Sequence, residues 1–201
     1  MIVLQHICKH FGKKQIFEDF SLEIPDGSFT IITGESGCGK TTLLDMIGGL
    51  ETPDTGEIVV DGKNINKIPR RIYFREEVGF LFQNFALMEN KTVKQNLEII
   101  KPKNRSAVSI EEALERVGLI HTLHTKVYQL SGGEQQRIAL ARLIIKKCNY
   151  ILADEPTGSL DEKNGRLVMD QLHQLNKEGK CIIMVTHNRA FLPEADMVVE
   201  L

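Results

Sequence analysis

The sequence has no tryptophan, few other aromatic residues and no long apolar run. Its longest uninterrupted apolar stretch, residues 181–185, is far shorter than the roughly 20 residues that a membrane-spanning helix needs. The N-terminus also lacks the apolar core of a secretory signal. We therefore expect no membrane-crossing segment, and we expect the chain to stay in the cytoplasm.

Cysteine is scarce, and neither sign of charge is in excess. The four cysteines, Cys8, Cys38, Cys148 and Cys181, form no C-x-x-C pair, which argues against a zinc site or a disulfide framework. The net charge is −2, with lysine and arginine spread along the chain, whereas nucleic-acid-binding domains usually carry a basic excess. No nucleic-acid partner is expected.

The length of 201 residues suits one domain, and the apolar patterns alternate between strand and helix periods. Strands are expected at 2–8, 20–24, 29–33, 57–60, 78–82, 150–153 and 181–185. Helices are expected at 40–48, 93–100, 110–117, 133–146 and 162–177. The last third has the pattern of a parallel βαβ crossover, and the early, closely spaced strands suggest antiparallel pairing.

Residues 84–132 contain no strand pattern, so they predict a helical subdomain inserted into an α/β core. The core would then consist of residues 1–83 and 133–201. This organisation describes one α/β domain with an antiparallel β subdomain at its N-terminus.

The segment 34–41 reads GESGCGKT and matches the phosphate-loop pattern G-x-x-x-x-G-K-[ST] between an expected strand and an expected helix. Such a loop directs backbone N–H groups at a polyphosphate, with the helix N-terminus behind them. Lys40 would reach the β- and γ-phosphates, and the Thr41 hydroxyl would bind Mg²⁺. The residues expected to contact ATP are Gly34, Glu35, Ser36, Gly37, Cys38, Gly39, Lys40, Thr41 and Thr42. Cys38 is either a small loop residue or a redox-sensitive thiol.

Two acids, Asp154 and Glu155, follow the buried-type strand 150–153. Beside a phosphate loop, Asp154 could hold Mg²⁺ and Glu155 could polarise an attacking water, which favours hydrolysis. The alternative is a pair of solvated acids at a strand end. Gln83 and His187 follow strands in the same way and could reach the same edge of the sheet.

The segment 130–137, LSGGEQQR, resembles the signature motif of ABC-type ATPases. Ser131, Gly132 and Gly133 could present a hydroxyl and bare N–H groups at the start of a helix, with Glu134 beside them. The sequence S-x-x-E also reads as a capping box, and the two interpretations are compatible. Together with the phosphate loop and the two acids, this resemblance implies the ABC fold, a P-loop ATPase core with an inserted helical signature subdomain.

The resemblance also implies roles for single residues. Gln83 would contact Mg²⁺ or its water, Glu155 would be the general base, and His187 would sense the γ-phosphate. Phe11 matches the aromatic that stacks on adenine, although it could instead belong to the core. In this family the signature of one protomer closes on the ATP of another, which implies a head-to-tail dimer with Asp161 at its interface.

The segments 79–85 and 155–161 look like those of the subgroup that serves macrolide-export and lipoprotein-release permeases, including bacteriocin-export systems. The resemblance therefore implies a separate membrane permease as partner and a peripheral location on the inner face of the cell membrane. Phe85, Leu87 and Met88 either form a groove for a permease helix or belong to the subdomain core. The chain ends soon after the His187 strand, so a C-terminal regulatory domain is not expected.

The same residues fit a second function, a nucleotide-gated regulator of a membrane partner, as in cell-division relatives. A soluble member acting on DNA or ribosomes is disfavoured, because such relatives carry a long coiled-coil insertion or two cassettes in one chain.

Overall fold

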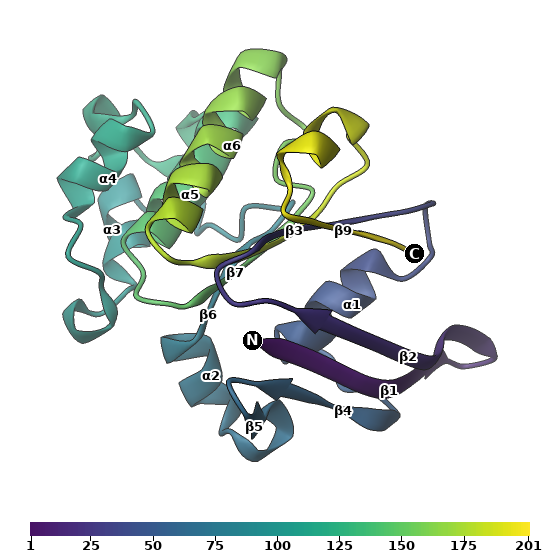
Figure 1. Cartoon of the computed structure of the whole chain (residues 1–201). Coiled ribbons are helices and arrows are strands. Elements are labelled where there is room, and N and C mark those ends of the chain that lie inside the picture. Colours follow the sequence, from purple (N-terminus) through teal and green to yellow (C-terminus); the bar gives the residue numbers. More distant parts are fainter.

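The computed structural model describes residues 1–201, which form two β-sheets flanked by helices (Figure 1). The first sheet is antiparallel, with the strand order β2-β1-β4-β5. Its strands are β1 (Ile2–Phe11), β2 (Lys14–Ile24), β4 (Thr55–Val60) and β5 (Lys63–Asn64). The antiparallel N-terminal subdomain that the sequence predicts is confirmed.

The second sheet is parallel, with the order β6-β7-β8-β3-β9. Its strands are β3 (Phe29–Thr33), β6 (Val78–Leu81), β7 (Tyr150–Asp154), β8 (Cys181–Val185) and β9 (Met197–Glu200). Strands β3 and β8 are buried along their whole length, as expected of central parallel strands that are covered on both faces. Because all five strands run the same way, the loops that follow them meet at one edge of the sheet.

The longer helices are α1 (Lys40–Ile47), α2 (Arg70–Glu76), α3 (Val93–Glu98), α4 (Ile110–Arg116), α5 (Gly132–Ile144) and α6 (Glu162–Lys177). Short 3-10 turns lie between them. No strand lies between β6 and β7, as the sequence predicts for the inserted helical part. No helix has both the length and the apolar character that a membrane crossing requires.

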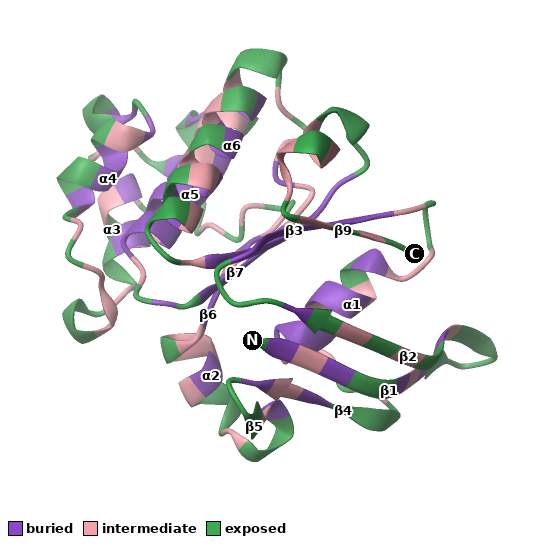
Figure 2. Ribbon diagram, viewed as in Figure 1, coloured by how far each residue is buried: buried purple, intermediate pink, exposed green.

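The parallel sheet divides the apolar core into two clusters, one on each face. Successive strand residues alternate between them: Ile31 and Ile151 face α5 and α6, whereas Ile32 and Leu152 face α1 and the antiparallel sheet. Figure 2 shows the buried residues concentrated in these central strands and on the inner sides of α5 and α6.

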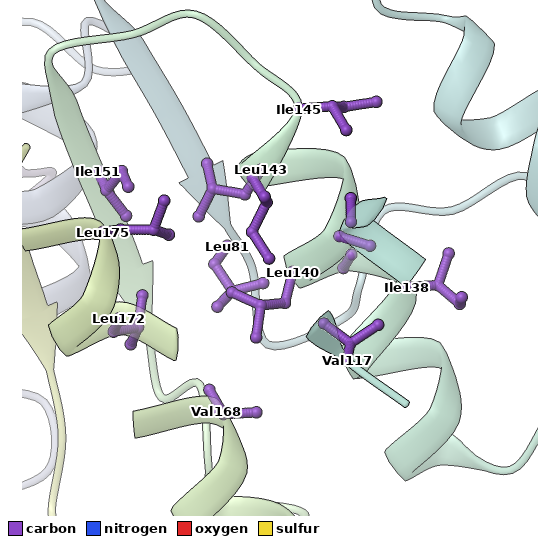
Figure 3. Close-up of a cluster of buried hydrophobic side chains, with 14 of the residues drawn as sticks. Leu81, Val117, Ile138, Leu140, Leu143, Ile145, Ile151, Val168, Leu172 and Leu175 are labelled. Carbon is purple, nitrogen blue, oxygen red and sulfur yellow. The ribbon is translucent and has the colours of Figure 1, made fainter. Parts of the chain in front are cut away.

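The helical segment shares the first of these clusters. Side chains of α3 and α4, such as Val93 and Leu114, belong to the same cluster as Ile138 and Leu140 of α5 and Ile151 of the sheet. Figure 3 shows part of this cluster, with Val117 after α4, Ile138 and Leu140 of α5 and Ile151 of β7 among the labelled side chains. Helix α5 therefore packs in the same cluster as the strand that ends at Asp154, directly before Glu155.

Three elements were missed by the sequence analysis: α2, β9 and β5, the last only two residues long. Strand β9 is a short edge strand in which half-buried and exposed positions alternate, so its apolar signal is small. Helix α2 carries four charged residues in seven positions and buries only Tyr73. In addition, β2 begins six residues before the predicted strand. The first half of β2 is mostly exposed, so it lacks the apolar pattern on which the prediction rests.

Candidate nucleotide site

A glycine-rich loop connects β3 to α1 and closes over the start of that helix. Gly34, Gly37 and Gly39 all have positive φ, of 144°, 79° and 111°. At Gly39 a Cβ atom would lie 2.6 Å from Cγ2 of Ile16 in β2, so only glycine fits there. Helix α1 has no side-chain cap, which leaves its first N–H groups facing the loop.

Lys40 is the first residue of α1, and its ammonium lies inside this loop. The side chain is almost fully buried. Its Nζ donates to the carbonyl oxygens of Gly34 at 3.0 Å and Glu35 at 2.6 Å, and Cys38 Sγ lies 3.7 Å away. No carboxylate pairs with Lys40, so the loop holds a buried positive charge that suits a polyphosphate.

The Thr41 hydroxyl and the Asp154 carboxylate meet below the loop. Thr41 Oγ1 lies 3.2 Å from Oδ2 and 3.4 Å from Oδ1 of Asp154. Burial raises the pKa of Asp154, and burial together with the charge of Asp154 raises the pKa of Asp45, one turn along α1 from Thr41. A crowded set of oxygen donors with excess negative charge suits a hard cation such as Mg²⁺.

Glu155 directly follows β7 in a left-handed conformation, with φ of 45°. Its side chain is only 15% exposed, and Oε1 is buried without a hydrogen-bond partner. Nε2 of His187, which follows β8, lies 3.3 Å from that oxygen but outside hydrogen-bond geometry. A strained backbone and an unpartnered buried carboxylate oxygen are features of functional sites.

A pocket of about 610 Å³ brings most of the predicted residues together. The predicted residues that line it are Ser36, Gly37, Gly39, Lys40, Thr41, Thr42, Gln83, Asp154, Glu155 and His187. Gly34, Glu35 and Cys38 belong to the same loop but do not line the pocket.

Sequence reasoning missed four lining residues, Lys14, Ile16, Gly158 and Val185. Lys14 Nζ donates to the carbonyl oxygen of Gly37 at 3.2 Å from the start of β2. A lysine near a hairpin turn carries no signal of its own in the sequence, because only the fold of the antiparallel sheet places it above the loop.

The signature residues lie elsewhere, at the start of α5. Ser131 and Glu134 form the reciprocal capping box: Glu134 N donates to Ser131 Oγ at 3.3 Å, and Ser131 N donates to Glu134 Oε2 at 2.8 Å. Ser131 Oγ also donates to Glu134 Oε2 at 2.8 Å, and the two bonds that the carboxylate accepts from Ser131 lower the pKa of Glu134. Ser131 and Gly132 are exposed, Gly133 follows them in the helix, and none of the four lines the pocket.

Asp161 and Phe11 are also outside the pocket. Asp161 caps α6 by accepting from the backbone N–H of Asn164 at 2.8 Å. Phe11, at the end of β1, is 49% exposed, with Lys9 Nζ 5.0 Å from its ring centroid. The alternative that Phe11 is a core residue is therefore wrong.

The family model described as "ABC transporter" matches residues 17–158. The chain belongs to the ABC transporter family. This ABC cassette is 38% identical to a macrolide export ATP-binding/permease protein, MacB, of Campylobacter jejuni, over its whole length but only 33% of that relative. It is 37% identical to the lipoprotein-releasing system ATP-binding protein LolD of Bacteroides fragilis, covering 97% of that protein.

Among solved structures, the cassette resembles the ATP-binding cassette MJ0796 in a dimeric post-hydrolysis state bound to ADP and Pi. The TM-score is 0.89 at 34% identity, covering all of this chain and 94% of that one. The predicted fold class, family and subgroup are confirmed. The cassette spans about a third of the length of the MacB relative.

Proposed function

We propose that this ABC cassette binds and hydrolyses ATP to drive export or release of a substrate through a separate membrane permease. The observation that carries the proposal is the pocket in which Lys40, the Thr41–Asp154 pair and Glu155 converge. Each residue offers what hydrolysis of a phosphoanhydride requires, namely a cation for the phosphates, oxygen ligands for a metal and a base for water. The relation to LolD and to the ADP-bound cassette supports it.

Mg²⁺ fits the oxygen donors of this pocket. Thr41, Asp154 and the Gln83 amide oxygen would hold it, directly or through water. When bound, the ion would neutralise charge on the β- and γ-phosphates. Burial raises the pKa of Asp154 by more than the Thr41 hydrogen bond and the charge of Lys40 lower it, and a bound cation would favour the charged carboxylate.

Glu155 would take the proton of the attacking water at Oε1, the atom that has no hydrogen-bond partner. His187 would orient that water and contact the γ-phosphate, since its Nε2 lies 3.3 Å from Glu155 Oε1 and its ring is about half exposed. Most of the Glu155 side chain is shielded from solvent, which limits competing contacts with bulk water.

A second copy of the chain would complete the site. Ser131, Gly132, Gly133 and Glu134 are remote from the pocket of their own protomer, yet they present a hydroxyl and a helix start at the surface. We propose that they close on ATP held by the partner in a head-to-tail dimer with two ATP molecules, with Asp161 at the interface. Phe11 would stack on adenine with its exposed ring.

The permease would dock beside the inserted helical part, for which we retain the boundaries 84–132, between core segments 1–83 and 133–201. Phe85 and Leu87 pack against the core, whereas Met88 remains exposed. An apolar groove lies next to them and is lined mainly by Leu50, Phe74, Phe80, Phe82, Ile99 and Ile100. Seated there, the cassette would be peripheral on the inner face of the membrane.

Substitution Glu155→Gln tests the function directly. We expect ATP binding within about twofold of the parent, an ATP-dependent dimer in size-exclusion chromatography, and a turnover at least about 100-fold lower, since a general base is removed. Glu111→Gln, at an exposed position of α4, is the matched control and should hydrolyse normally. Parent-like turnover of the Glu155 variant would remove the base assignment, and failure of the parent to hydrolyse ATP would remove the proposed function.

A further inference from the structure

Basic residues are concentrated in three short segments, 62–75, 99–110 and 142–149. These segments hold eleven of the 25 lysine and arginine residues of the chain and none of its 27 aspartate and glutamate residues. Because the whole chain has a net charge of −2, the rest of the cassette is strongly acidic. The small net charge of the chain is therefore the sum of three basic segments and an acidic remainder.

The three segments contact one another, although they are distant in sequence. Lys146 Nζ donates to the carbonyl oxygens of Phe74 and Val78, both at 2.5 Å. The backbone N–H of Lys147 donates to the carbonyl oxygen of Asn104 at 2.9 Å. In Figure 1 the first segment runs from β5 through α2. The fold therefore gathers these charges into one surface.

Of the seven exposed basic side chains in these segments, Lys63 lies near Asp61, and the other six form what we name the basic rim: Lys67, Arg70, Arg71, Lys101, Lys103 and Lys147. None of the six lies within 4.0 Å of a carboxylate, and only Arg75 among their neighbours forms an ion pair, with Glu76. Their like charges repel one another without compensation inside the chain. An anionic partner would relieve that repulsion.

The three basic segments extend to the apolar groove described above, which Arg142 and Lys146 help to line and in which Ile99 is 49% and Leu50 is 40% exposed. Exposed aliphatic side chains flanked by flexible lysine and arginine are typical of surfaces that meet the interfacial region of a membrane. On an ordinary solvent-exposed surface, lysine and arginine are interspersed with aspartate and glutamate, as they are in the rest of this chain.

We propose that the basic rim binds the anionic lipid headgroups of the membrane surface, so that the cassette contacts lipid as well as its permease. Lipid is favoured over an acidic permease loop, because cytoplasmic loops of membrane proteins carry an excess of lysine and arginine and would repel the rim. The cytoplasmic leaflet, in contrast, is negatively charged. The inference rests on the proposed function only in placing the cassette at a membrane.

Flotation of the purified full chain with vesicles tests the proposal. We expect binding to phosphatidylcholine vesicles containing roughly 30% phosphatidylglycerol to exceed binding to pure phosphatidylcholine by about tenfold or more, and to weaken as salt rises. The triple variant Lys67→Glu, Arg70→Glu, Arg71→Glu should lose that preference. Triple reversal at Lys13, Lys163 and Lys177, exposed lysines outside the rim, changes net charge equally and should retain most binding.

Equal loss in the two triple variants would overturn the proposal, since net charge alone would then explain binding. Equal affinity of the parent for the two vesicle types would also overturn it. Parent-like vesicle binding by the rim variant, with loss of permease-stimulated turnover, would assign the rim to an acidic protein segment instead. Turnover without vesicles should stay within about twofold of the parent in both variants, which separates this result from failure of the ATPase itself.

Discussion

Gln136 of α5 donates a hydrogen bond of 2.9 Å from Nε2 to the carbonyl oxygen of Pro156, the residue that follows Glu155. Gln136 is 1% exposed, and the bond joins the signature helix to the turn that holds Glu155 in its left-handed conformation. The three buried side-chain polar atoms without a partner, Gln136 Oε1, Arg137 Nε and Glu155 Oε1, all lie on these two segments. The unpartnered buried polar atoms of the chain are thus concentrated at the junction between α5 and the Glu155 turn.

Substitution Gln136→Met is expected to lower kcat about tenfold while ATP binding stays within about twofold, because Glu155 loses its positioning contact. Stability should change little: Pro156 O loses its donor, but the unpartnered Oε1, which costs about 1–3 kcal/mol, is removed. Thermal unfolding and steady-state kinetics on the same preparation check this. Gln174→Met, on the exposed side of α6, is the control. A parallel fall in Tm and kcat would assign Gln136 a structural role only.

Substitution Asp154→Asn is expected to stabilise the protein at neutral pH while abolishing hydrolysis. Burial raises the folded-state pKa of Asp154 above its ordinary value of 3.8, so the folded state holds the proton more tightly. The free energy of unfolding therefore falls as the pH rises from about 3.8 toward the folded-state pKa of Asp154. Above that pKa it falls no further on account of this group. The asparagine variant lacks this loss and also relieves Asp45, whose pKa Asp154 raises.

Thermal melts from pH 4 to 8 measure the effect of Asp154→Asn. We expect Tm about 2–4 °C above the parent at pH 7 and a difference that shrinks toward pH 4. Mg²⁺ together with ATP should raise the Tm of the parent and not that of the variant. A variant less stable than the parent at pH 7 would show that Asp154 is not a strained buried charge.

A mixture of two inactive variants tests the shared site. Lys40→Ala disables the phosphate loop, and Ser131→Arg blocks the signature helix start; each alone should lose nearly all turnover. In a head-to-tail dimer, a one-to-one mixture restores one intact site in each heterodimer, or up to about a quarter of the parent sites. Absence of any recovery, with heterodimers demonstrated by a tag, would argue that loop and signature act within one chain.

Several features of this cassette are predicted by short local patterns in its sequence. The phosphate loop was recognised because a tight turn that surrounds a polyphosphate needs glycine at fixed places, and Gly34, Gly37 and Gly39 do adopt positive φ. The buried strands β3, β7 and β8 were recognised because continuous apolar runs mark parallel strands. Both signals are contained within a few consecutive residues.

Other features depend on residues that are distant in sequence. Lys14 reaches the phosphate loop only because the antiparallel sheet folds against it, and the Gln136–Pro156 bond only because α5 packs beside β7. Strand β9 is defined by its pairing with β3, since its own apolar signal is weak.

The sequence by itself determined which candidate residues for phosphate, metal and water contacts this protein carries, since those proposed roles require particular side chains at short, fixed spacings. Only the tertiary structure decided how these residues are distributed in space. It placed Thr41, Asp154 and Glu155 in one pocket, left Ser131 outside it, and gathered dispersed basic residues beside an apolar groove. The reason is physical: side-chain chemistry is local, whereas proximity between distant segments is fixed by how sheets and helices bury their apolar faces.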